Sequence, residues 1–262
     1  MASGDEVRQR ERAFYDRQAA ALGPAEPPRP PDEYDLALLE ALGPLPGLRV
    51  LELGCGRGNL TLELLQRGAD VVALDLSAAM VDLARGRAER FQPEATARFV
   101  AAPVEDTGLQ SGSFDRVVGK WILHHADVGR AAREVARLLR PSGRAAFFEN
   151  QDRNPVLRAA RRALWRLPGL QPVGTHDERP LGRRELDELQ AMFGQVELEY
   201  PSFYFFEALS RALGHRLYRR LRALDGTVWR RVPGARPYGY HVLIVVTRGD
   251  ERAAAGRRIQ QP

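Results

Sequence analysis

The sequence of 262 residues contains only one cysteine, Cys55, and only one lysine, Lys120. A single cysteine excludes an intramolecular disulfide and a cysteine-based zinc cluster, and we predict no metal site. No apolar run reaches the eighteen residues that a membrane span needs, and residues 1–12 are polar and charged where a secretory signal needs an apolar segment. These absences predict a cytoplasmic protein with one main domain.

The net charge of +5 is unevenly distributed along the chain. Residues 1–152 carry 19 basic and 23 acidic side chains, whereas the remainder carries 20 basic and 11 acidic ones. Since all cations but Lys120 are arginines, we attribute the bias to genome composition and predict no nucleic-acid partner. The basic second half suits an anionic substrate or a membrane surface, and ordinary solvated charge is the interpretation that we favour.

Short apolar runs alternate with helical patterns from Leu48 onward, as in a parallel sheet with crossover helices. The expected strands are residues 49–53, 70–74, 97–101, 115–119 and 144–149. Asn59, Ser77 and Asp127 are the expected N-caps of the helices between them. This order predicts a doubly wound, Rossmann-like α/β sheet, and residues 196–200 and 240–247 are expected to add an antiparallel edge pair.

Four parts of the chain follow from this pattern. Residues 1–44 form an N-terminal arm with a short helix-like stretch at Phe14-Tyr15-Asp16, a proline-rich linker, and a helix over 34–42 that buries Leu36, Leu39 and Leu42. Residues 45–150 form the core. Residues 151–249 supply capping helices that begin at Pro155 and Arg183, a leucine-arginine helix over 209–224, and the last two strands; residues 250–262 form a disordered tail.

A glycine turn, Glu52-Leu53-Gly54-Cys55-Gly56-Arg57-Gly58, follows the first expected strand. Residues without a Cβ let backbone amides approach a ligand closely. The spacing Gly-x-Gly-x-Gly differs from the Gly-x-Gly-x-x-Gly of dinucleotide sites, and Glu52 could order a ligand ammonium. Asp75 ends the next strand, 21 residues after Gly54, where an acid accepts ribose hydroxyls. Glycines used for tight packing, and an aspartate used as a helix cap, are the alternatives.

Five segments resemble, in order and in register, the successive motifs of class I S-adenosylmethionine-dependent methyltransferases: residues 50–59, 75–77, 113–118, 123–125 and 138–143. The resemblance covers about residues 45–150 and is closest to the small-molecule branch that includes quinone-biosynthesis and natural-product enzymes. It implies a seven-stranded, mostly parallel sheet with an antiparallel last strand, a helical cap or insertion, S-adenosylmethionine as cofactor, and methyl transfer to a small-molecule acceptor.

The resemblance also implies positions for the cofactor. Gly54, Gly56 and Gly58 would face its methionine part, Asp75 its ribose, Leu76 and Met80 its adenine, and the main chain at Lys120 its amino-acid end. Relatives often hold the adenine amino group with an aspartate after the third strand, where this chain has Pro103. Either Glu105 or the backbone at Val104 replaces it, or the adenine is held by stacking and main chain alone.

Methyl transfer from a sulfonium is an in-line displacement that depends on alignment more than on acid-base chemistry. If the acceptor is a phenol, hydroxyl or ammonium, a base must remove its proton, and His125 or His124 is the candidate. A structural hydrogen bond is the alternative for each. Tyr15 resembles a tyrosine that some relatives bring over the cofactor, and His176 and the aromatic run Phe203-Tyr204-Phe205-Phe206 lie where the acceptor should bind.

Three competing interpretations remain. A nicotinamide-dependent oxidoreductase is disfavoured by the glycine spacing and the later motifs. A cofactor-binding protein without turnover has Pro103 as its only support. The helix over 209–224 could lie on anionic lipid and present a lipid-linked acceptor, although we favour a lid over the substrate pocket.

Overall fold

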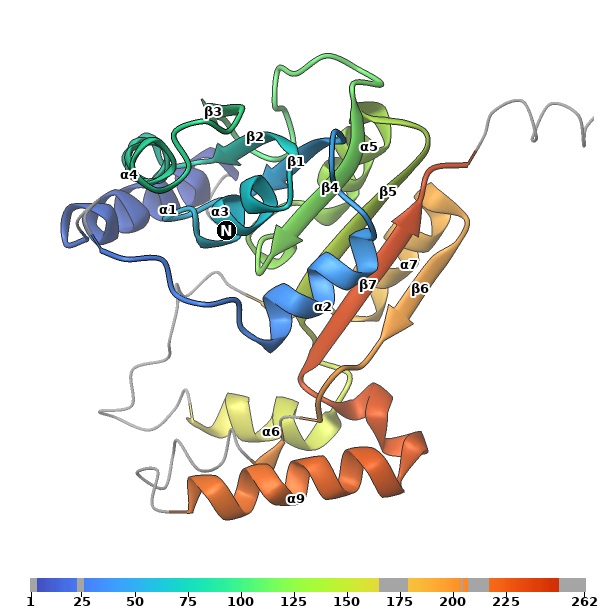
Figure 1. The fold of residues 1–262 in the computed structure, drawn as a ribbon. Coiled ribbons are helices and arrows are strands. Elements are labelled where there is room, and N and C mark those ends of the chain that lie inside the picture. The colour runs from blue at the N-terminus through green and yellow to red at the C-terminus, as the bar shows by residue number, and fades with distance from the viewer. Residues whose placement is uncertain (1–3, 23–25, 165–178, 204, 207–216, 250–262) are drawn as a thin grey trace, which may run out of the picture.

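The computed structural model describes residues 4–22, 26–164, 179–203, 205–206 and 217–249. Seven strands form one sheet in the order β3-β2-β1-β4-β5-β7-β6 (Figure 1). The strands are β1 (Arg49–Leu53), β2 (Asp70–Asp75), β3 (Ala97–Ala101), β4 (Phe114–Lys120), β5 (Leu139–Asn150), β6 (Val196–Glu199) and β7 (His241–Thr247).

The first five strands pair in parallel, and β7 runs antiparallel between β5 and β6. Glu52 pairs with Ala73 on β2 and with Val118 on β4, and the start of β7, His241, lies opposite Asn150 at the end of β5. The carboxyl ends of β1, β2, β4 and β5 therefore share one edge of the sheet. The predicted seven-stranded sheet with an antiparallel last strand is confirmed.

Helices cover both faces of the sheet (Figure 1). They are α1 (Gly4–Ala20), α2 (Glu33–Leu42), α3 (Asn59–Gln66), α4 (Ala78–Phe91), α5 (Val128–Leu138), α6 (Pro155–Leu164), α7 (Arg183–Phe193) and α9 (Tyr218–Arg231), with short 3-10 helices η1 (Leu123–His125) and η2 (Pro233–Tyr238). The side chains of Ser77 and Asp127 cap α4 and α5 as predicted, whereas Gly58 and not Asn59 is the N-cap of α3.

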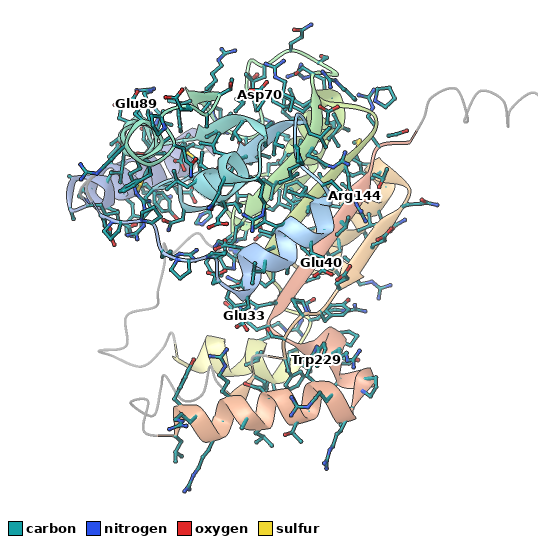
Figure 2. The ribbon with its side chains drawn as sticks, in the orientation of Figure 1. Glu33, Glu40, Asp70, Glu89, Arg144 and Trp229 are labelled. Carbon is teal, nitrogen blue, oxygen red and sulfur yellow. The ribbon has the colours of Figure 1, made fainter. Side chains whose placement is uncertain are left out.

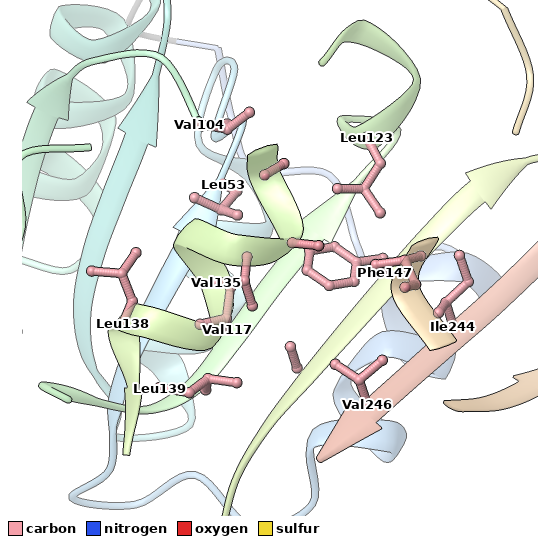
Figure 3. Close-up of a cluster of buried hydrophobic side chains, with 14 of the residues drawn as sticks. Leu53, Val104, Val117, Leu123, Val135, Leu138, Leu139, Phe147, Ile244 and Val246 are labelled. Atoms are coloured by element: carbon pink, nitrogen blue, oxygen red, sulfur yellow. The ribbon is translucent and has the colours of Figure 1, made fainter. Parts of the chain in front are cut away.

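Alternate residues of each strand enter two hydrophobic cores because successive side chains in a strand point to opposite faces. Leu53, Val117 and Phe147 pack with α5 and α7 on one face (Figure 3). Val118 and Phe148, their neighbours in sequence, pack on the other face with α2, α3 and α4. The sheet is thus buried on both sides, as parallel sheets generally are.

Four sequence predictions need correction. The strand expected at 144–149 begins at Leu139, because the turn at residues 141–143 joins the ladder: Ser142 N donates to Arg248 O, and Arg248 N donates to Gly143 O. Helix α2 buries Leu38, Leu39 and Leu42, while Leu36 is 49% exposed. The N-terminal helix is longer than expected. The helix expected over 209–224 ends later, because α9 spans Tyr218–Arg231, and residues 209–216 lie outside the described residues.

Helices α6 and α9 form a layer beyond the edge where the parallel strands end, and Trp229 lies within it (Figure 2). The indole Nε1 of Trp229 donates to Tyr200 O at 2.6 Å, which ties α9 to the chain just after β6. None of the described helices is long and apolar enough to cross a membrane.

Candidate functional site

The glycine turn lies between β1 and α3, at the shared edge of the sheet. Gly54, Gly56 and Gly58 all have positive φ, at +71°, +50° and +78°. A Cβ on Gly54 would lie 2.8 Å from Cδ1 of Ile122, and a Cβ on Gly58 would lie 3.0 Å from Cβ of Ala84, so both positions require glycine. A Cβ on Gly56 would meet no heavy atom within 4 Å. The turn is packed on its flanks and open at its centre.

Asp75, at the end of β2, joins this turn to the next one. Its Oδ2 accepts from Gly56 N at 2.8 Å, and its Oδ1 accepts from Ser77 N at 2.9 Å. Burial raises the pKa of Asp75, while the hydrogen bonds from Ser77 and Gly56 oppose that rise. A carboxylate has about four acceptor sites, so the backbone hydrogen bonds from Gly56, Leu76 and Ser77 leave capacity for a ligand hydroxyl.

Glu52 lies at the end of β1, under the glycine turn, and is 2% exposed. Its Oε2 accepts from the hydroxyl of Thr61 at 2.5 Å. Burial raises the pKa of Glu52 to about 8, against the lowering effects of the Thr61 hydrogen bond and the Lys120 charge. The neutral form of this acid is therefore favoured at neutral pH.

Leu76, Met80 and Val104, the apolar residues expected near the adenine, follow β2 and β3 in the chain. Met80 and Val104 are buried, Leu76 is half-buried, and Met80 N donates to the Ser77 hydroxyl that caps α4. Glu105 accepts from Asp127 N at 3.1 Å, at the start of α5. One oxygen of Glu105 is therefore engaged with α5.

Lys120, at the end of β4, turns its side chain toward α2. Its ammonium donates to the buried Asp35 and, at 3.4 Å, to Asp32, which caps α2. Although burial opposes ionisation, the Lys120 contact lowers the pKa of Asp35, and Arg29 adds to this effect. The Lys120 side chain is thus committed to a structural ion cluster, which leaves only its main chain for the predicted role.

The N-terminal helix α1 packs against α4 (Figure 1). Its polar side chains contact the site. The Ser77 hydroxyl donates to Asp16 at 2.5 Å. The hydroxyl of Tyr15 lies 3.3 Å from Nε2 of His125, and a carboxylate oxygen of Glu11 lies 2.9 Å from Nδ1 of the same ring. Helix α1 thereby brings a phenol and an acid to His125.

His124 occupies a different environment from its neighbour. Its Nδ1 lies 2.7 Å from Oε2 of Glu149, whose other oxygen accepts from the amides of Ile122 and Leu123. Glu149 is fully buried at the end of β5. These bonds hold the turn after β4. Because Glu149 satisfies the hydrogen-bonding need of the His124 ring, they favour a structural role for His124.

Trp121 directly follows β4 and has a φ of +56°, which is rare for a bulky residue. It is 36% exposed and stands edge-on to Tyr34 and Phe148, with ring centroids at 5.7 and 6.3 Å. Tyr34 and Phe148 also contact His241. This aromatic cluster lies at the carboxyl edge of β4 and β5, which is the edge that carries the glycine turn.

Sequence reasoning missed Glu11, Asp16, Trp121 and Arg87. Arg87, on α4, is almost fully buried and donates to Arg57 O and to the side chain of Asn59, which fixes the end of the glycine turn. Positive charge at a helical position gave no signal of this contact. Phe203 is buried and Phe205 and Phe206 half-buried, while His176 and Tyr204 lie outside the described residues.

An α/β sheet whose glycine turn is bonded to an acid at the end of the neighbouring strand is typical of nucleoside-cofactor binding proteins. Residues 51–147 match the family model described as "Methyltransferase domain". The chain is 33% identical over 220 residues to a malonyl-[acyl-carrier protein] O-methyltransferase of Enterobacter lignolyticus, a match that covers 76% of this chain and 82% of the relative.

Two further proteins resemble it over different lengths. A ubiquinone biosynthesis O-methyltransferase of Acinetobacter baylyi is 36% identical over 142 residues, which are 53% of this chain and 58% of the relative. The structure of a geranyl diphosphate methyltransferase in complex with S-adenosylmethionine superposes with a TM-score of 0.57 at 22% identity, covering 82% of this chain and 84% of that one. The chain belongs to the class I S-adenosylmethionine-dependent methyltransferases, and its cofactor is S-adenosylmethionine.

Proposed function

We propose that this enzyme methylates an oxygen atom of a small-molecule acceptor, which binds between the carboxyl edge of the sheet and the layer of α6 and α9. The observation that carries the proposed methyl-donor site is the Asp75 carboxylate. It accepts hydrogen bonds from the amides of Gly56 and Ser77 and so holds together the two turns that would face the cofactor. The open centre of the turn at Gly56 fits a cofactor that approaches the backbone closely.

A partner among the described residues can be proposed for each part of the cofactor. Asp75 would accept the ribose hydroxyls with its remaining acceptor sites, and Glu52 would ionise and order the ammonium. Leu76, Met80 and Val104 would pack against the adenine, with Glu105 beside them. The main chain at Lys120 would face the amino-acid end, and Tyr15 would cover the pocket and exclude water. When bound, S-adenosylmethionine supplies a methyl group that is already activated on sulfur.

Two features support an oxygen acceptor with apolar character. Both relatives named above are O-methyltransferases by their printed names, one for a malonyl group on a carrier protein and one in ubiquinone biosynthesis. The exposed Trp121 and the half-buried Tyr34, which pack on the buried Phe148, offer an aromatic surface for such an acceptor. His125, one turn beyond Trp121, would take the proton that an oxygen nucleophile must lose.

The test combines calorimetry with a labelled methyl donor. We expect S-adenosylmethionine and S-adenosylhomocysteine to bind, and a fraction of small metabolites from the source organism to acquire the labelled methyl group. Cofactor binding with no methylated product from any extract would instead support a binding protein without turnover.

A second candidate is a lipid-linked acceptor, which α9 favours. Leu217 and Leu224 are exposed there, at 43% and 41%, among the exposed arginines 219, 220, 222, 230 and 231. Such a surface suits the headgroup region of an anionic membrane. Co-sedimentation with phosphatidylglycerol vesicles tests whether α9 binds a membrane. Binding in low salt would support a lipid-linked acceptor, and the absence of binding in low salt would exclude it.

A further inference from the structure

Glu11 is an acid that the proposed function does not use, although it is 4% exposed and lies in an otherwise polar helix, α1. Its carboxylate contacts Nδ1 of His125 at 2.9 Å, across 114 residues of sequence. Taking a carboxylate out of water is costly unless a partner compensates, and the imidazole is the partner here. The burial of Glu11 is therefore linked to the protonation of the His125 ring.

The contact determines which ring nitrogen of His125 carries the proton. An ionised carboxylate only accepts hydrogen bonds, so Nδ1 must be the donor. In the neutral ring, Nε2 then accepts hydrogen bonds, and it lies 3.3 Å from the hydroxyl of Tyr15. This is the tautomer that a general base needs when its substrate approaches from the Tyr15 side.

We propose that Glu11 is a positioning residue that fixes the Nδ1-protonated tautomer of His125 and stabilises its protonated form, so that Nε2 receives the acceptor proton by way of Tyr15. The inference rests on the proposed function, because it assumes that an oxygen acceptor loses a proton at this site. Helix α1 would then contribute to the chemistry as well as cover the cofactor.

The proton balance follows from these contacts. Tyr15 gives its hydroxyl proton to Nε2 and takes the proton of the acceptor oxygen, while that oxygen receives the methyl group and the sulfonium becomes a neutral thioether. Glu11 stays ionised and pairs with the imidazolium. His125 afterwards returns its proton to water, so the net products are the methylated acceptor, S-adenosylhomocysteine and one proton.

Several titratable groups among the described residues interact with His125. Glu11 and Tyr15 come from α1, and Asp75 from β2 interacts with its charge. His124 stacks beside it with ring centroids 4.2 Å apart. The two acids favour the imidazolium, whereas a protonated His124 would oppose it. Of these, Glu11 contacts the ring from a helix outside the sheet, whereas Asp75 also holds the amides of Gly56 and Ser77, so Glu11 is the position to change.

The test measures the tautomer and titration of His125 by nitrogen-15 NMR of the full chain, with His125→Gln identifying its signals. We expect Nδ1 to be protonated in the wild type. In Glu11→Gln we expect the titration midpoint of His125 to fall by about one pH unit, because a carboxylate in contact is lost. Glu6→Gln, an exposed position on the same helix, is the matched control and should leave the midpoint unchanged. An Nε2-protonated ring, or equal midpoints in all three proteins, would overturn the proposal.

Two further measurements separate this inference from the proposed function. Calorimetry with S-adenosylhomocysteine should give similar affinity for the wild type and Glu11→Gln. With the metabolite fraction that accepts label, the acidic limb of the kcat profile should move to lower pH in Glu11→Gln, and its plateau should fall about tenfold. If the wild type did not bind S-adenosylhomocysteine, the proposed function would be refuted. Intact binding with an unmoved acidic limb would refute only the role of Glu11.

Discussion

Glu52→Gln should make the cofactor-free protein more stable at alkaline pH while it weakens cofactor binding. The pKa of Glu52 is about 8 in the folded chain, against an ordinary value of 4.5, because burial disfavours its charged form. The stabilisation from the neutral acid is therefore fully present below about pH 4.5, and it is lost as the pH rises through about 8.

The difference between these two pKa values corresponds to at most about 5 kcal/mol, and structural relaxation around the charge reduces it. Glutamine imitates the neutral acid and still accepts from Thr61. We expect Glu52→Gln to unfold with a free energy about 2 to 4 kcal/mol higher than the wild type at pH 9, and with an equal one at pH 4.5.

Denaturant titrations at several pH values measure this difference, with Glu89→Gln at an exposed position of α4 as control (Figure 2). Cofactor binding gives a second readout: if the ammonium orders Glu52, binding at pH 7 should release close to one proton, seen by calorimetry in buffers of different ionisation enthalpy. Glutamine should abolish that release. Parallel stability profiles for the wild type and Glu52→Gln from pH 5 to 9 would refute the reasoning.

Three other predictions test separate parts of the site. Asp75→Ala and Gly54→Arg should each weaken S-adenosylmethionine binding at least tenfold, about 1.4 kcal/mol, and unchanged affinity in calorimetry for both would contradict the placement of the cofactor. Trp121→Asn should raise the acceptor KM while cofactor affinity is kept, because asparagine tolerates the positive φ of +56° but offers no aromatic surface; an unchanged KM would remove Trp121 from the acceptor site. Against the effect of burial, hydrogen bonds from Arg137 and Thr107 lower the pKa of Glu134 to about 2, so its stabilisation is present above pH 4.5 and is lost as the pH falls through about 2. Glu134→Gln should cost about 2 kcal/mol near neutral pH in denaturant unfolding, and a cost that persists at pH 2 would argue against this charge pairing.

Features that depend on neighbouring residues could be predicted from the sequence. Strand positions followed from apolar runs, and the caps at Ser77 and Asp127 followed from side chains that accept from amides three residues away. The glycine turn and Asp75 identified the family and its cofactor because both lie in short, ordered motifs. The assignment of individual side chains to the cofactor stays a prediction.

Contacts between side chains far apart in the sequence could not be predicted in this way. Glu11 and His125 lie 114 residues apart, and Lys120 and Asp35 lie 85 apart. Their contacts depend on how α1 and α2 pack, which no local pattern encodes. Residues 141–143 were not expected to belong to a strand, because their hydrogen-bond partner, Arg248, directly follows β7 and lies about 100 residues further along the chain. Local propensity sets the elements, whereas burial of their apolar faces sets their arrangement, and the polar contacts of the site follow from that arrangement.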